Sequence, residues 1–121
     1  MKIQKHKGMK RVYFAFLNST KGFVWLIKNE AAFRQEFMVS VILLLLSFFL
    51  NINALEQLML ISVLGFVLII EVLNTAIEAV IDRIGLEHHP LSGLAKDLGS
   101  LAVLFSLFIA VATWLVVLWT I

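Results

Sequence analysis

Four polar side chains, three of them acidic, recur at helical spacing in an otherwise apolar stretch of the sequence. Glu71, Asn74 and Glu78 are spaced i, i+3 and i+7, and Asp82 follows four residues later. Residues at these intervals share one face of an α-helix. A charged group within hydrocarbon costs at least about 2.5–3.5 kcal/mol on insertion scales, so such residues mark either a functional site or a charge partner. This acidic row is the first candidate for a functional site.

The acidic row either holds helices together through salt bridges or binds something else. Salt bridges need cations at similar depth, and the apolar segments contain only Lys96, near one end. Carboxylates without matching cations suit protons or a hard divalent metal such as Mg²⁺, which often takes one or two carboxylates plus substrate phosphates. At about 1.5 Å per residue, Glu78 lies about 7–8 Å and Glu71 about 18 Å from Arg83. We interpret the row as a polar cleft that opens at the Arg83 end.

Further charged residues can join this cleft from neighbouring segments. Glu30 and Glu36 lie at one end of an apolar run, and Lys96 and Arg11 offer positive charge to a phosphate. Metal-binding acids, a base and nearby cations are the groups that phosphoryl transfer requires, since positioning and electrostatics carry most of its catalysis. The sequence has neither a G-x-x-x-x-G-K-[ST] motif nor the glycine-rich loop of protein kinases. A nucleotide site would therefore have to be built differently.

The elements that position these residues are predicted to be membrane helices. Of the 121 residues, 61% are hydrophobic, against about 45–50% in soluble domains, and the mean hydropathy is +0.98. The absence of cysteine excludes disulfides, thiolate metal sites and thiol nucleophiles. The net charge of +2 is too small to indicate nucleic-acid binding. These values predict a small integral membrane protein with a single domain over residues 1–121.

We expect an all-α fold with one surface helix and three transmembrane helices. Residues 9–29 combine a basic stripe with many aromatic side chains, which is typical of an amphipathic helix lying in the membrane interface. About 20 residues are needed to cross the hydrocarbon. The three spans are expected at about residues 31–52, 54–84 and 92–120.

The distribution of basic residues predicts the orientation in the membrane. Eight of the 10 Lys and Arg residues lie in the first 34 residues, and the other two are Arg83 and Lys96. The positive-inside rule therefore places the N-terminus and the 83–97 loop in the cytoplasm and the C-terminus outside. Residues 1–8 are polar and basic and do not resemble a secretory signal. Asn51, Ile52 and Asn53 predict a turn, and Ser92 is the expected N-cap of the last helix.

Three segments resemble signature motifs of the integral-membrane bacterial diacylglycerol kinase family. They read NEAAFRQE at 29–36, EVLNTAIEAVIDRIG at 71–85, and EHHPLS at 87–92 followed by AKDLGS at 95–100. The resemblance extends from about Lys10 to Trp119. It implies an ATP-dependent lipid kinase of the inner membrane, a homotrimer of three-helix subunits whose active sites are shared between neighbouring subunits.

The same resemblance implies a role for individual residues. Glu71 resembles the general base acting on the lipid hydroxyl, while Glu30 and Glu78 resemble the ligands of Mg²⁺, with Asn74 supporting them. Besides the two metal ligands, the residues on the ATP side are Arg11, Asn18, Glu87, His88, His89, Lys96 and Asp97. Besides the base, the residues on the lipid side are Arg11, Ala32, Phe33, Arg34, Gln35, Glu36, Ser100 and Trp114. Mg²⁺ is thus the expected cofactor and ATP the co-substrate.

Several functions are compatible with these observations to different degrees. The preferred reading is phosphorylation of diacylglycerol to phosphatidic acid, and the nearest alternative is an undecaprenol kinase with the same mechanism. A proton-coupled transporter is a different class, which typically has four spans and one dominant carboxylate per chain. A non-catalytic membrane subunit would leave the acidic row without a purpose. The expected partners are the lipid substrate, the membrane and two further copies of the chain, with no nucleic acid.

Overall fold

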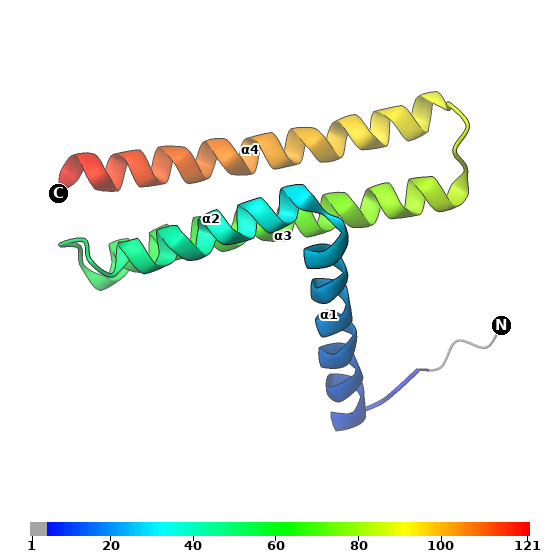
Figure 1. The fold of residues 1–121 in the computed structure, drawn as a ribbon, viewed down its shortest axis with the longest axis horizontal. Helices are drawn as coiled ribbons and strands as arrows, with labels where there is room; N and C mark the ends of the chain where they lie inside the picture. Colours follow the sequence, from blue (N-terminus) through cyan, green and yellow to red (C-terminus); the bar gives the residue numbers. More distant parts are fainter. Residues whose placement is uncertain (1–4) are drawn as a thin grey trace. The chain divides into compact units, whose positions relative to one another are not determined.

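The computed structural model describes residues 5–121 as four α-helices joined by short turns (Figure 1). The helices are α1 (Met9–Asn29), α2 (Ala31–Ser47), α3 (Ala54–Ile84) and α4 (Pro90–Thr120). The described part of the chain contains no β-strand, so the predicted all-α class is confirmed. Residues 1–4, which belong to the polar segment expected at 1–8, lie outside the described residues. Two compact units divide the chain, with the boundary between Gln35 and Glu36 in the second turn of α2.

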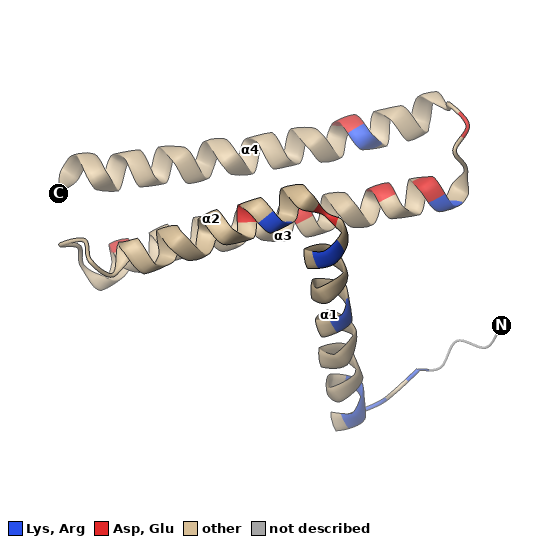
Figure 2. Ribbon diagram, viewed as in Figure 1, with Lys and Arg blue, Asp and Glu red and all other residues tan. Residues whose placement is uncertain are grey.

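The first unit contains α1 and the start of α2. The bounds of α1 agree with the predicted surface helix, and its basic residues recur along its length in Figure 2. Glu30 adopts an extended conformation and ends the helix. The guanidinium of Arg34 donates a hydrogen bond to the Ile27 carbonyl oxygen at 2.7 Å, and the Phe23 and Phe33 rings pack edge to face. A cation that binds the free carbonyls at a helix C-terminus stabilises that end, so Arg34 secures the bend between the two helices.

In the second unit, α3 and α4 form an antiparallel hairpin whose helices pack along their length (Figure 1). Small residues lie on the buried side of α4, which lets the two backbones approach. The buried residues of this pair are Leu60, Leu64, Val67 and Ile81 in α3 and Gly99, Ser106, Ala110 and Val117 in α4. Most other apolar side chains of both helices are exposed. Extended apolar surface of this kind marks contact with a membrane or with other chains.

The part of α2 in the second unit runs antiparallel to α3. Near the end of α2, the Gln57 side-chain amide donates a hydrogen bond to the Ser47 hydroxyl at 2.6 Å. At the other end, the carboxyl group of Glu36 interacts with that of Glu71. These two contacts join residues in opposite order along the two helices, which establishes their relative direction.

The turn between α2 and α3 is longer than predicted, because α2 ends at Ser47 and not near residue 52. The backbone N–H groups of Phe48, Phe49 and Leu50 donate to carbonyl oxygens three residues earlier, at 3.0–3.3 Å. This tighter pattern closes the helix as a 3₁₀-type turn. Asn53 then caps α3 in a reciprocal pair with Glu56, so that α3 begins at Ala54 as predicted.

The start of α4 corrects one prediction. Ser92 is not the N-cap, because the helix begins two residues earlier, at Pro90. The Nδ1 atom of His89 accepts a hydrogen bond from the Leu91 N–H at 3.1 Å, which makes His89 the capping residue. Proline is well tolerated as the first helical residue, since its missing N–H would have no partner there in any case. Pro90 therefore opens the helix.

Two helices in the described part of the chain are long and apolar enough to cross a membrane, α3 and α4. Each has 31 residues, about 46 Å of helix, against a hydrocarbon thickness of about 30 Å. Only 17% of the most apolar window of each helix is buried, whereas the core helix of a soluble protein would be mostly buried. The 17 residues of α2 are about 26 Å long. The first of the three expected spans, at residues 31–52, therefore stays a prediction.

Candidate active site

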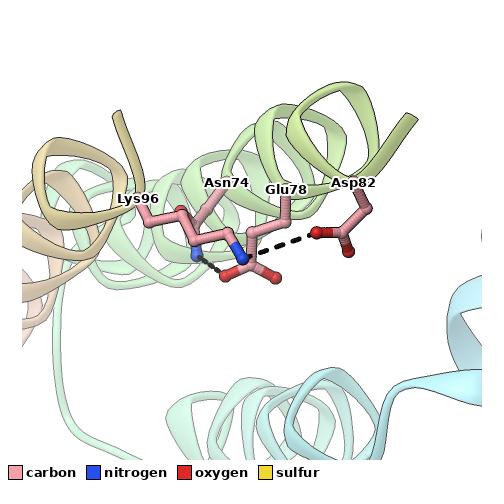
Figure 3. A network of polar contacts seen from close by, with 4 residues as sticks. All are labelled: Asn74, Glu78, Asp82 and Lys96. Atoms are coloured by element: carbon pink, nitrogen blue, oxygen red, sulfur yellow. Dashed lines mark hydrogen bonds and ion pairs between the residues drawn. The ribbon is translucent and has the colours of Figure 1, made fainter. Parts of the chain in front are cut away.

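The acidic row lies on one face of the second half of α3, as its spacing predicts (Figures 2 and 3). Glu71, Asn74 and Glu78 are half-buried, whereas Asp82, closest to the turn, is exposed. The Asn74 Nδ2 atom donates a hydrogen bond to Glu78 Oε1 at 3.5 Å. Because a carboxylate only accepts, the nitrogen of the amide faces Glu78 and its oxygen points away. The row is thus a polar strip within a largely apolar helix pair, with Asn74 and Glu78 joined at its centre.

Lys96 of α4 reaches across to this row (Figure 3). Its Nζ atom lies 3.4 Å from Asp82 Oδ1, an ion pair that joins α3 to α4. The two side chains are 48% and 56% exposed. Exposed pairs of this kind contribute only about 0–1 kcal/mol to stability. The ammonium group of Lys96 can therefore exchange Asp82 for another anion at little cost.

A pocket of about 250 Å³ lies where α3 turns into α4. Four residues that the family resemblance predicts for the ATP side line it, Glu87, His88, His89 and Lys96. The other lining residues are Ile81, Asp82, Gly85, Leu86, Ser92 and Gly93. The acidic row therefore leads directly into a concave site with an ammonium group at the junction.

The predicted base and one predicted lipid-side residue come together from different helices. Glu36 of α2 is half-buried and interacts with Glu71 of α3. The Thr75 hydroxyl donates a hydrogen bond to the Glu71 backbone carbonyl at 3.0 Å. The two carboxyl groups thus form a second polar centre between α2 and α3, and Glu71 lies seven residues or about 10 Å along α3 from Glu78.

Other predicted site residues of the second unit are spread along α4. Asp97 and Ser100 are exposed and follow Lys96, and neither lines the pocket. Trp114 is half-buried farther along, and its indole N–H has no hydrogen-bond partner among residues 5–121. Ser100 and Trp114 are separated by 14 residues, about 21 Å of helix. Two residues this far apart cannot both contact a compact ligand such as a phosphate group.

The remaining predicted site residues belong to the first unit. They are Arg11 and Asn18 in α1, Glu30 at its end, and Ala32, Phe33, Arg34 and Gln35 in the first turns of α2. Glu30 donates its backbone N–H to the Leu26 carbonyl oxygen at 2.9 Å, which leaves its carboxylate uncommitted by the cap. Arg34 instead uses its guanidinium on the end of α1.

Several residues around the pocket and the acidic row were not predicted to have a role. Asp82 was recognised as part of the row but received no role, and it both lines the pocket and binds Lys96. Ser92 and Gly93 also line the pocket. Gly99 is buried against Asn74. An isolated glycine in an otherwise apolar helix usually has a packing or functional reason. Its position in the sequence could therefore have pointed to Gly99.

The oxygen donors of the row fit Mg²⁺ that arrives with a phosphate ligand. Among residues 5–121, no three His, Asp or Glu side chains gather closely enough to hold a metal ion by themselves. Mg²⁺ commonly needs only one or two carboxylates, because substrate phosphates and waters complete its octahedral shell. The carboxylate of Glu78 is the kind of group that can supply such a ligand, whereas the Asn74 Oδ1 atom faces Gly99 and is turned away from Glu78.

Comparison with known proteins agrees with these features. The model of the prokaryotic diacylglycerol kinase family matches residues 17–118. A protein of Escherichia coli K12 named diacylglycerol kinase is 44% identical over 117 residues, covering 85% of this chain and 96% of the relative. The diacylglycerol kinase of Pseudomonas aeruginosa PAO1 is 42% identical over 111 residues, covering 92% and 90%.

A third relative, the diacylglycerol kinase of Haemophilus influenzae, is 45% identical over 102 residues, covering 81% of this chain and 86% of its own. The region matched by the family model, residues 17–118, contains all of α2 and α3 and nearly all of α4, including the acidic row and the pocket. The resemblance drawn from the three sequence motifs is thereby confirmed. The chain is a kinase and belongs to the prokaryotic diacylglycerol kinase family.

Proposed function

We propose that the protein transfers the γ-phosphoryl group of ATP to diacylglycerol at the cytoplasmic face of the membrane. The lipid hydroxyl oxygen bonds to the γ-phosphorus, the bond from that phosphorus to ADP breaks, and the hydroxyl proton passes to Glu71. The products are phosphatidic acid and ADP. The main support is that the acidic row of α3 leads directly into the pocket at the α3–α4 turn, with Lys96 at the junction.

The pocket is the proposed ATP site. Its lining offers polar groups from Glu87, His88 and His89 on the turn. Lys96 would release Asp82 and bind a phosphate oxygen, which the weak, exposed ion pair permits. Asp97, Arg11 and Asn18 are proposed as further nucleotide contacts. A nucleotide bound in this pocket would extend its phosphates along α3 towards Glu78.

Glu78 is the proposed ligand that holds Mg²⁺ against the phosphates, with Glu30 as the second carboxylate. When bound there, Mg²⁺ would supply positive charge that stabilises the negative charge of the phosphates. Asn74 donates its amide N–H to Glu78 and so orients the carboxylate. Hydrogen bonds of this kind, one step removed from a metal, are commonly worth 10- to 100-fold in metal affinity, about the effect we assign to Asn74.

Glu71 is the proposed general base. It lies about two helical turns from Glu78, beyond the pocket residues, where the lipid hydroxyl would approach the γ-phosphate from the opposite side. Glu36 interacts with Glu71 and would hold it in place. Ser100, Trp114, Arg11 and the segment Ala32–Gln35 are proposed to contact the lipid.

A trimer with shared active sites is proposed for the assembled enzyme. The acidic row is only half-buried within one chain, and most of the apolar surface of α3 and α4 is exposed. Burial of that surface against neighbouring subunits would exclude water from the row, which strengthens its electrostatic interactions. Glu30 and Arg11 would then enter a site formed with another subunit's α3 and α4.

Labelled ATP distinguishes the candidate functions. Purified protein in mixed micelles is expected to transfer the γ-phosphate of radiolabelled ATP to diacylglycerol in a Mg²⁺-dependent reaction. Micelles that contain undecaprenol in place of diacylglycerol are the matched control. Faster labelling of undecaprenol would identify the other lipid as the substrate, and no labelling of either lipid would contradict the kinase proposal.

Cysteine labelling tests the proposed orientation. The chain contains no cysteine, so single cysteines at Asn51 and at His88, both exposed, report on the two turns. Asn51→Cys should react with an impermeant thiol reagent outside intact cells, and His88→Cys only after the membrane is opened. The reverse pattern would place the pocket on the side without ATP and contradict the proposed function.

A further inference from the structure

One close approach of α4 to the acidic row is made by a residue without a side chain. Gly99 is buried in α4 and faces Asn74. A Cβ atom at this position would lie 3.3 Å from Asn74 Cγ and would overlap Asn74 Oδ1. The carboxamide of Asn74 therefore occupies the space that any other residue at position 99 would fill.

This requirement is specific to Gly99 among the described glycines of α3 and α4. A Cβ atom added at Gly65 or Gly93 would meet nothing within 4 Å, nor would one at Gly85 in the turn. Glycine inside a helix is destabilising relative to alanine, because it loses more conformational freedom on folding. At position 99, however, a larger residue would clash with Asn74, and this clash explains why glycine stands there.

The space at Gly99 admits the Asn74 amide, and the carboxylate of Glu78 sets which way the amide is turned. Its oxygen is buried on the Gly99 side and has no hydrogen-bond partner among residues 5–121. Its nitrogen donates to Glu78. A buried acceptor without a partner is destabilising, so this orientation is not explained by the stability of the chain alone. What the arrangement achieves is a donor held on the carboxylate of Glu78.

We propose that Gly99 is a positioning residue for Glu78. The open space at Gly99 admits the Asn74 amide between the helices, and the amide orients the Glu78 carboxylate towards the metal–nucleotide complex. The inference rests on the proposed function, in which Glu78 holds Mg²⁺ with ATP. The proposal adds that position 99 of α4 must be glycine. Gly99 acts on Glu78 through Asn74 and not through contact with any substrate.

The test measures metal binding directly. Mn²⁺ replaces Mg²⁺ as a paramagnetic probe, and its binding to the detergent-solubilised protein is followed by electron paramagnetic resonance with a non-hydrolysable ATP analogue present. Gly99→Ala should weaken Mn²⁺ binding by about 10-fold or more, because disturbed second-sphere hydrogen bonds commonly cost 10–100-fold. Gly65→Ala, the same change inside α3, is the matched control and should leave Mn²⁺ binding unchanged.

A double-mutant cycle separates positioning from simple helix packing. Asn74→Ser removes the amide and should itself weaken Mn²⁺ binding. In that background Gly99→Ala should cause little further loss, because its Cβ no longer meets an amide oxygen. Equal losses in both backgrounds, or no loss in the native background, would overturn the proposal.

Folding gives a second measurement if Gly99→Ala alone does not yield folded protein. The proposal then requires the double variant to fold and to bind Mn²⁺ as Asn74→Ser does. A double variant that is also unfolded would show that Gly99 serves helix packing regardless of Asn74, and would overturn the proposal. Absence of Mn²⁺ binding and of phosphoryl transfer in the unaltered protein would instead contradict the proposed function itself.

Discussion

Glu71→Gln is expected to lower kcat by about 10²–10⁴-fold, the usual contribution of a positioned general base. Glutamine keeps the shape of the side chain but cannot accept the hydroxyl proton. Binding of MgATP should be largely kept, because Glu71 interacts with Glu36 and lies about 10 Å along α3 from Glu78. Turnover at saturating MgATP and lipid, together with calorimetric binding of a non-hydrolysable ATP analogue, measures both effects.

Glu71→Asp is the graded control for this prediction. The shorter side chain keeps a base but withdraws it by one methylene group, so its kcat should fall between those of the native protein and Glu71→Gln. The assignment would be wrong if Glu71→Gln abolished binding of the nucleotide while turnover at saturating MgATP stayed intact. Glu71 would then be a ligand.

Glu78→Gln is expected to lower turnover at limiting Mg²⁺ by at least about 100-fold, and also to weaken nucleotide binding. A metal ligand contributes more than the second-sphere partners that are worth 10–100-fold. The amide of glutamine keeps the size of the side chain and removes its negative charge. Turnover measured across a Mg²⁺ series, with Mn²⁺ binding measured alongside, checks the prediction, and excess Mg²⁺ should restore part of the activity.

Glu56→Gln is the matched control for Glu78. Glu56 lies on the same helix, but its carboxylate is engaged in the cap of α3 with Asn53, far from the pocket. Its substitution should affect stability only slightly and leave the Mg²⁺ dependence unchanged. Near-normal turnover of Glu78→Gln at limiting Mg²⁺ would rule out Glu78 as the metal ligand.

Because Glu71 and Glu78 are assigned different roles, comparison of their variants tests that assignment. Loss of the proposed base should change kcat with little effect on nucleotide affinity, whereas loss of the proposed ligand should change both. Identical behaviour of the two variants would indicate that the acidic row acts as one unit, and the division of roles along α3 would have to be abandoned.

Local chemistry was sufficient to predict much of the fold. The helix over Met9–Asn29 follows from its amphipathic pattern, and the start of α3 follows from the turn at Asn53. The shared face of Glu71, Asn74 and Glu78 is a direct consequence of helical periodicity. Predictions failed where short-range hydrogen bonding decided the ends of helices, at Ser47 and at the cap formed by His89.

The sequence by itself determined the helical class, the apolar character of α3 and α4, the acidic row and the family motifs, because each depends on neighbours within a few residues. Only the tertiary structure decided which distant residues meet: Lys96 with Asp82, Glu36 with Glu71, and Gly99 with Asn74. These contacts depend on how each helix is rotated and shifted against the next. Rotation and shift are set by the interlocking of whole side-chain surfaces, for which no local pattern in the chain is sufficient.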